Sequence, residues 1–151
     1  FMKKQIIFFA DQRFVFKTQV SNLEESFDDV CEIHLFTKPE EVFEQIKSIP
    51  ANVPYVLVLD SVLPGQNVDD MFSGTKNFFK DLKKLEEDLV ATRSRSYGIE
   101  PLENRAKVII FSPTLFEEEV HFDFFAQVNS LLEEADDELF SILQKALQIE
   151  D

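Results

Sequence analysis

Four short runs along the chain have the length and the apolar character of β-strands. Residues 5–9, 55–59 and 107–111 are apolar almost throughout, which predicts strands that are buried on both faces. Residues 31–36 alternate instead, which predicts a strand with Cys31 facing the interior. Fully apolar strands of this kind are typical of a parallel sheet that is covered by helices on both sides.

Between these runs, apolar residues recur every three or four positions, which predicts amphipathic helices. The second helix is expected to open at Thr37 as the N-cap, with Pro39 in the first turn and Glu40 completing a capping box. The apolar stripes of the first two predicted helices are Phe16, Val20, Leu23 and Phe27, followed by Val42, Phe43, Ile46 and Ile49.

The second half of the chain continues the alternation of helices and strands. A long third helix is expected over about 69–91, followed by a polar loop at 92–98. After the strand at 107–111 we expect a helix over 115–126 and a short fifth strand over 128–132. The stripes of the third and last helices are Phe78, Leu82, Leu85 and Leu89, and then Leu139, Ile142, Leu143 and Leu147 within 136–147.

This order predicts an α/β fold with a five-stranded parallel sheet, five helices and right-handed crossovers. An alternative is that residues 116–147 form two helices with no strand between them. We expect one domain over residues 2–151, with Phe1 as a residue that cloning leaves ahead of Met2.

Composition narrows the classes of function. The net charge of −14 argues against a surface for duplex DNA or for an anionic membrane, because both require basic residues. Only three glycines are present, and no G-x-G-x-x-G motif for a dinucleotide occurs. No run of about 18 apolar residues and no signal peptide is visible, so we expect a cytoplasmic protein.

Polar side chains stand at the ends of three of the predicted strands. Asp11 comes after the first strand, Asp60 after the third and Ser112 after the fourth. Because ligands bind at the carboxyl ends of parallel strands, these side chains are expected to share one site. An aspartate at the end of a strand is, taken alone, more often a turn residue, but three polar strand ends in this order favour a site.

The two carboxylates would repel each other and therefore favour a cation. Oxygen ligands from Asp11, Asp60 and a backbone carbonyl suit Mg²⁺. Such an ion would attract a phosphoryl donor, and the Asp60 carboxylate could attack the phosphorus to give an aspartyl phosphate. The hydroxyl of Ser112 would then help to hold the phosphoryl oxygens.

Three segments resemble motifs of the receiver domain of bacterial two-component response regulators. They are IIFFADQ at 6–12, LDSVLPG at 59–65 and IIFSP at 109–113. The resemblance covers nearly the whole chain and implies a flavodoxin-like (βα)5 three-layer sandwich. It also implies that Asp60 is the phosphoacceptor, that Asp11 and the backbone carbonyl of Val62 are further Mg²⁺ ligands, and that Ser112 is the switch hydroxyl.

The chain also departs from the family pattern. Ala10 stands where the family usually has a first acid, and the connection from Asp60 to Ser112 is longer, with an extended third helix and loop. The family's lysine is expected within 131–135, where Glu133 and Glu134 are the only charged residues. The aromatic switch residue before it is expected at Leu131 or Ser130, neither of which is aromatic.

Two functional hypotheses follow, and neither is enzymatic. In the first, Asp60 is phosphorylated by a sensor histidine kinase or a phosphotransfer protein, and Mg²⁺ is held in a weakened site. In the second, the chain is a pseudo-receiver that acts through protein contacts without phosphorylation. Charge is unevenly placed, with 8 of the 15 basic residues at 76–107 and 11 acids after 115, so self-association through opposed patches is a further hypothesis.

Overall fold

The computed structural model describes residues 3–65, 69–96 and 100–149. Five parallel strands form one sheet in the order β2-β1-β3-β4-β5, so that β3 is central. The expected five-stranded parallel sheet is therefore confirmed. The strands are β1 (Lys4–Phe9), β2 (Cys31–Phe36), β3 (Tyr55–Leu59), β4 (Ala106–Ser112) and β5 (Phe124–Asn129).

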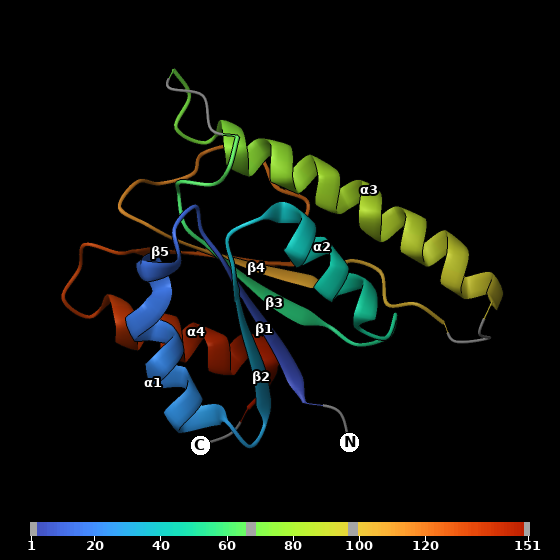
Figure 1. Ribbon diagram of the computed structural model, residues 1–151, viewed down its shortest axis with the longest axis horizontal. Helices are drawn as coiled ribbons and strands as arrows, with labels where there is room; N and C mark the ends of the chain where they lie inside the picture. The colour runs from blue at the N-terminus through green and yellow to red at the C-terminus, as the bar shows by residue number, and fades with distance from the viewer. Residues whose placement is uncertain (1–2, 66–68, 97–99, 150–151) are drawn as a thin grey trace.

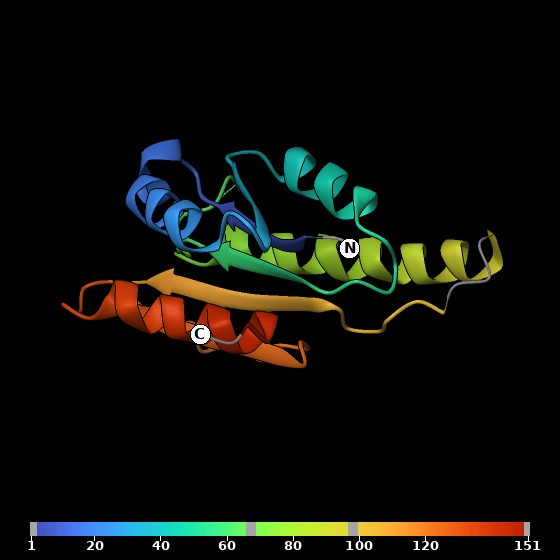
Figure 2. The ribbon, with the colours of Figure 1, turned by 90° about the horizontal axis from the view of Figure 1, so that it is seen from below.

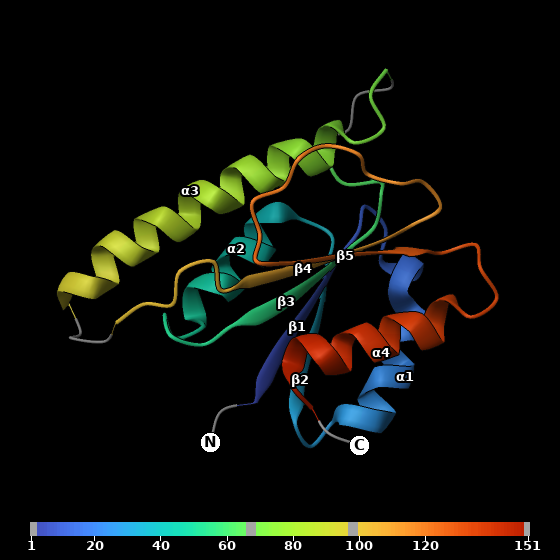
Figure 3. The ribbon, with the colours of Figure 1, turned by 180° about the vertical axis from the view of Figure 1, so that it is seen from behind.

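Helices cover both faces of the sheet and give three layers (Figures 1 and 2). The helices α1 and α4 lie side by side on one face (Figure 3), where Phe27 stacks on Phe140 with ring centroids 4.8 Å apart. The helices α2 and α3 cover the opposite face (Figure 1). The helices are α1 (Lys17–Phe27), which follows a 3-10 turn over Arg13–Phe16, α2 (Pro39–Ser48), α3 (Ser73–Ser96) and α4 (Ala135–Leu147).

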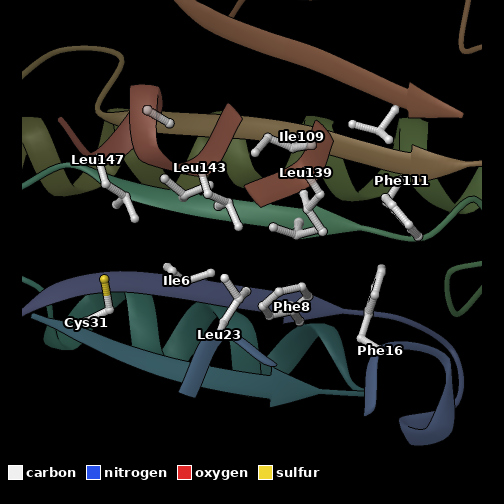
Figure 4. Close-up of a cluster of buried hydrophobic side chains, with 14 of the residues drawn as sticks. Ile6, Phe8, Phe16, Leu23, Cys31, Ile109, Phe111, Leu139, Leu143 and Leu147 are labelled. Carbon is white, nitrogen blue, oxygen red and sulfur yellow. The ribbon is translucent and has the colours of Figure 1, made fainter. Parts of the chain in front are cut away.

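Alternate residues of the central strands supply the two cores. Ile6, Phe8, Val56, Val58 and Ile109 face α1 and α4. Figure 4 shows part of this core, including buried Cys31, Leu23 of α1, and Leu139, Leu143 and Leu147 of α4. The intervening residues Ile7, Phe9, Leu57, Leu59 and Val108 face α2 and α3. Within the described residues, no helix is both long enough and apolar enough to cross a membrane.

The expected helix over 115–126 is wrong. Residues 113–123 form an irregular segment, and β5 begins at Phe124 rather than at residue 128. Two hydrogen bonds of 2.8 Å join the Gln127 side chain to the backbone N–H and carbonyl of Phe116, in place of helical partners. Phe116 is itself buried, so tertiary packing determines the path of this segment. The described residues therefore contain four α-helices, not the five expected.

Two helix ends also differ from expectation. Lys38, not Thr37, is the N-cap of α2, no side-chain hydrogen bond caps this helix, and Pro39 is its first residue. The restricted φ of proline therefore defines the start of this helix without a capping box. The helix α3 continues through residues 92–96, which were expected to form a loop, and the rest of that loop, 97–98, lies outside the described residues.

A buried arginine joins three elements at the amino end of the sheet. Arg105 is 2% exposed, and its Nε donates to both carboxylate oxygens of Glu86 on α3 at 3.0 Å. Its guanidinium carbon lies 5.0 Å from the centre of the Tyr55 ring. Its remaining nitrogens donate to carbonyl groups at the end of α2, those of Ile46, Ile49 and Pro50. Sequence reasoning placed Arg105 in a basic surface patch, which is wrong because this side chain is buried.

Gly74 allows the first turn of α3 to pack against the loop that follows β3. A Cβ atom at this position would lie 2.8 Å from the carbonyl oxygen of Leu63. We expect Gly74→Ala to lower the free energy of unfolding by about 1–3 kcal/mol, because this contact outweighs the higher helix propensity of alanine. The exposed Asn77 of the same helix offers a matched control. Urea denaturation should show Asn77→Ala neutral or stabilising, and a stabilised Gly74→Ala would contradict the packing argument.

Candidate functional site

The candidate site lies at the carboxyl edge of the sheet, where Asp60 follows the central strand β3. The backbone N–H of Asp60 donates to the carbonyl of Phe9 at 3.1 Å, and that of Asp11 donates to the carbonyl of Val62 at 3.1 Å. These two hydrogen bonds tie the loops after β1 and β3 together. The backbone thus brings Asp11 and Asp60 to neighbouring positions on one edge.

The Asp60 carboxyl group is partly buried, while Asp11 is exposed. One Asp60 oxygen accepts a hydrogen bond of 2.8 Å from the backbone N–H of Ser61. Burial raises the pKa of Asp60 above its ordinary value, and the nearby charge of Asp11 raises it further. Hydrogen bonds from Ser61 and Val62 oppose this increase in the pKa without cancelling it.

The raised pKa has a consequence for stability. The folded state binds the Asp60 proton more tightly than the unfolded state does, so stability falls as pH rises through the interval between the unfolded and folded pKa values. We expect Asp60→Asn to raise the free energy of unfolding at neutral pH by less than about 1 kcal/mol, since solvent screens the partly exposed charge. Thermal melts at pH 3 and pH 7 provide the measurement. A variant less stable than wild type at pH 7 would contradict this prediction.

Ser112 is the last residue of β4 and is buried. Its Oγ accepts a hydrogen bond of 3.1 Å from the backbone N–H of Thr114, so its proton is left to donate elsewhere. The register pairs Leu59 with Ile110, which places Ser112 at the same edge as Asp60 on the neighbouring strand. The structure therefore brings together the three strand ends that the sequence singled out, while their chemical roles stay predictions.

The family pattern has its lysine at the end of the fifth strand, so the observed end of β5 corrects the position expected for it. The strand ends at Asn129, which pairs with Ser112, whereas Glu133 and Glu134 lie beyond it just before α4. The position at the strand end therefore carries a neutral amide, not the acid expected. Residues Leu131 and Ser130 also follow the strand, so their assignment to the aromatic switch position is wrong. Residues 124–128 have the composition of a strand. This signal was missed because residues 115–126 were assigned to a helix.

The donor groups at this edge suit a hard cation, although they are few. Asp11 and Asp60 supply carboxylate oxygens, and the Val62 carbonyl, which already accepts one hydrogen bond, keeps a second lone pair. Mg²⁺ binds through one or two carboxylates and retains several waters, so this oxygen set fits it. Among the described residues, no group of three or more His, Cys, Asp or Glu side chains is placed to hold a metal.

Exposed apolar side chains occur on loops at the same edge of the sheet as the candidate site. Six of the seven large hydrophobic residues that are exposed in the described part of the chain lie on segments that follow the carboxyl ends of strands. Patches of exposed apolar residues commonly mark interaction surfaces. We call these six residues the apolar rim: Phe14, Val62, Met71, Leu115, Leu131 and Leu132.

Several basic residues that the sequence assigned to a surface patch make contacts within the molecule. Lys76 forms ion pairs with Asp70 at 2.9 Å and with Glu118 at 3.2 Å. Lys107 donates to the backbone carbonyl of Ala146 at the end of α4. These contacts, together with buried Arg105, reduce the positive charge that is available for self-association.

Comparisons with solved structures identify the architecture. No family profile and no curated protein sequence matches this chain. A response regulator receiver protein from Dyadobacter fermentans aligns over 95% of this chain and 97% of its own, with a TM-score of 0.59 and 18% identity. The receiver domain of Francisella response regulator 1452 aligns over 97% and 98%, with a TM-score of 0.55 and 14% identity.

A two-component response regulator from Cytophaga hutchinsonii is also similar, over 98% of this chain and 99% of its own, with a TM-score of 0.53 and 13% identity. The fold is therefore the flavodoxin-like three-layer sandwich, in the form found in response-regulator receiver domains. The resemblance noted from three short motifs is confirmed at the level of the fold.

Proposed function

We propose that this chain is a receiver domain in which Asp60 accepts a phosphoryl group and which signals through protein contacts at the carboxyl edge of the sheet. The observation that carries this proposal is a partly buried carboxylate directly after the central strand, at an edge whose loops carry the apolar rim. Such an edge suits a protein that delivers a phosphoryl group, which must seat its donor directly over Asp60. A sensor histidine kinase or a phosphotransfer protein is that donor.

The chemistry proposed is a single group transfer. An oxygen of the Asp60 carboxylate attacks phosphorus, the bond from phosphorus to the donor's leaving group breaks, and the leaving group departs with the electron pair. The Ser112 hydroxyl donates to a phosphoryl oxygen. When bound by Asp11, Asp60 and the Val62 carbonyl, Mg²⁺ supplies positive charge that offsets the charge of the two carboxylates and the phosphoryl group.

A second candidate, a pseudo-receiver that acts without phosphorylation, is favoured by one specific observation. Ala10 stands where the family usually has an acid, and Asn129 stands where the family has its lysine. The site therefore has one carboxylate fewer and lacks that cation. The loss of a cation weakens the binding of a phosphoryl group. The apolar rim would serve as a docking surface in this case too.

Intact-mass measurement tests the first candidate. The protein is incubated with acetyl phosphate and Mg²⁺, beside Asp60→Asn and the control Asp88→Asn, which removes an exposed acid from α3. We expect wild type and Asp88→Asn to gain one phosphoryl group, and Asp60→Asn to gain none. Chelation of Mg²⁺ should reduce the gain at least tenfold. Absence of any gain in wild type would favour the pseudo-receiver.

A further inference from the structure

A cavity of about 400 Å³ lies between α3 and the segment that joins β4 to β5. Its lining comes from the middle of α3, from residues at the start of β4, and from residues just before β5. It therefore lies toward the amino ends of the strands, whereas Asp60 lies at their carboxyl ends. Figure 3 shows the segment before β5 running beside α3.

Residues of the non-helical segment 113–123 form one wall of the cavity. The rings of Phe116 and Phe122 contact Phe79 of α3 edge to face, with centroids 5.7 and 5.0 Å away. These contacts hold the segment against α3, while the rest of it leaves space over the start of β4. The apolar part of the wall is Phe79, Leu82, Val90, Ala106, Val120 and Phe122.

The charged part of the lining is mostly acidic. Glu86 is already paired with buried Arg105, but Glu87, Glu103 and Glu119 take part in none of the ion pairs found among the described residues. Lys83 is the one lysine or arginine in the lining. An apolar interior with excess negative charge at its border is complementary to a molecule with an apolar body and a positive charge.

We propose that this cavity binds a small organic cation, with an aromatic or branched aliphatic body against the apolar wall and an ammonium group facing Glu87, Glu103 and Glu119. The volume lies within the range of small-molecule sites and is too small for a helix of a partner protein. An anionic ligand would meet three carboxylates. This proposal does not depend on phosphorylation of Asp60.

Isothermal titration calorimetry with three naphthalene probes tests the proposal. The cationic probe is 1-naphthylmethylamine, the neutral probe is 1-naphthalenemethanol, and the anionic probe is 1-naphthoate. We expect the amine to bind at least fivefold more tightly than the alcohol, and the naphthoate to bind most weakly. The double variant Glu87→Gln/Glu103→Gln should weaken amine binding about fivefold or more and leave alcohol binding unchanged, since each carboxylate near the surface contributes a few-fold.

Two further variants distinguish the cavity from the general acidity of the protein. Asp81→Asn/Asp88→Asn removes two exposed acids of α3 that do not line the cavity, and it should leave amine binding unchanged. Val90→Trp should fill the cavity and abolish binding of the amine and the alcohol, with thermal melts showing that the variant is folded. Equal affinity for amine and alcohol would overturn the proposal. Amine binding that survives Val90→Trp, or falls equally in both double variants, would also overturn it.

Discussion

Replacing Arg105 with methionine is expected to lower the free energy of unfolding by about 3–5 kcal/mol, the largest effect of any single substitution considered for this protein. The reason is that the guanidinium group satisfies the Glu86 carboxylate and three carbonyl groups at the end of α2. Methionine fills much of the volume but donates no hydrogen bond. The carboxylate, whose side chain is 17% exposed, would be left without its cation.

Urea denaturation followed by circular dichroism gives the measurement. Lys84→Met, on the exposed surface of α3, is the matched control and should change stability by less than about 0.5 kcal/mol. Arg105→Lys should also lose more than about 1 kcal/mol, because one ammonium group cannot reach partners on α2 and α3 together. A loss below about 1 kcal/mol for Arg105→Met would show that the Arg105–Glu86 pair does not join these elements in solution.

Placing a lysine at the end of β5 is expected to increase the rate of Asp60 phosphorylation by about 10–100-fold. Asn129 pairs with Ser112 at the edge that carries Asp60, two strands away, or roughly 10 Å at the usual strand spacing. A lysine in Asn129→Lys can extend toward a phosphoryl group on Asp60. A charge-assisted hydrogen bond there contributes about 1.5–3 kcal/mol, which corresponds to the expected rate increase.

The measurement is a time course of intact mass with acetyl phosphate and Mg²⁺. Asn129→Met is the matched control, since it has a similar length without charge and likewise loses the hydrogen bond from the Leu131 N–H to the Asn129 side chain. The increase should vanish in Asn129→Lys/Asp60→Asn. Equal rates for the lysine and methionine variants would mean that the end of β5 does not face the phosphoryl group.

The sheet could be predicted from the sequence because its strands carry local signals. The strand Tyr55–Leu59 is apolar in every position and ends at Asp60, and the observed bounds agree with the prediction. Cys31 alternates with polar residues and is buried, as predicted. In such strands, burial on both faces dictates the composition, so local sequence and tertiary structure agree.

The segment before β5 could not be predicted, because its structure depends on distant residues. Phe116 and Phe122 pack on Phe79, which lies more than 30 positions earlier, and Gln127 binds the Phe116 backbone. The spacing of apolar residues within 115–126 is compatible with an amphipathic helix and equally compatible with these tertiary contacts. Because residues 115–126 were assigned to a helix, the fifth strand was predicted too late in the chain, at 128–132. The residue assigned to the family's lysine position was displaced with it.

The candidate site was predicted in part. The positions of Asp11, Asp60 and Ser112 at one edge follow from strand order alone, and the structure places them there. Most of the apolar rim was missed, since an exposed leucine such as Leu131 cannot be told from a buried one without its neighbours. Arg105 was missed for the opposite reason, because an arginine in a stretch that also holds Glu103, Asn104 and Lys107 resembles a surface residue.

Mapping the modified residue tests most directly whether Asp60 is the phosphoacceptor. After incubation of wild type and Asn129→Lys with acetyl phosphate and Mg²⁺, borohydride reduction converts an aspartyl phosphate into a stable alcohol that peptide mass spectrometry can locate. We expect the reduced residue at position 60 alone, with higher occupancy in Asn129→Lys. Reduction at another carboxylate, or at none in either protein, would contradict the assignment of Asp60.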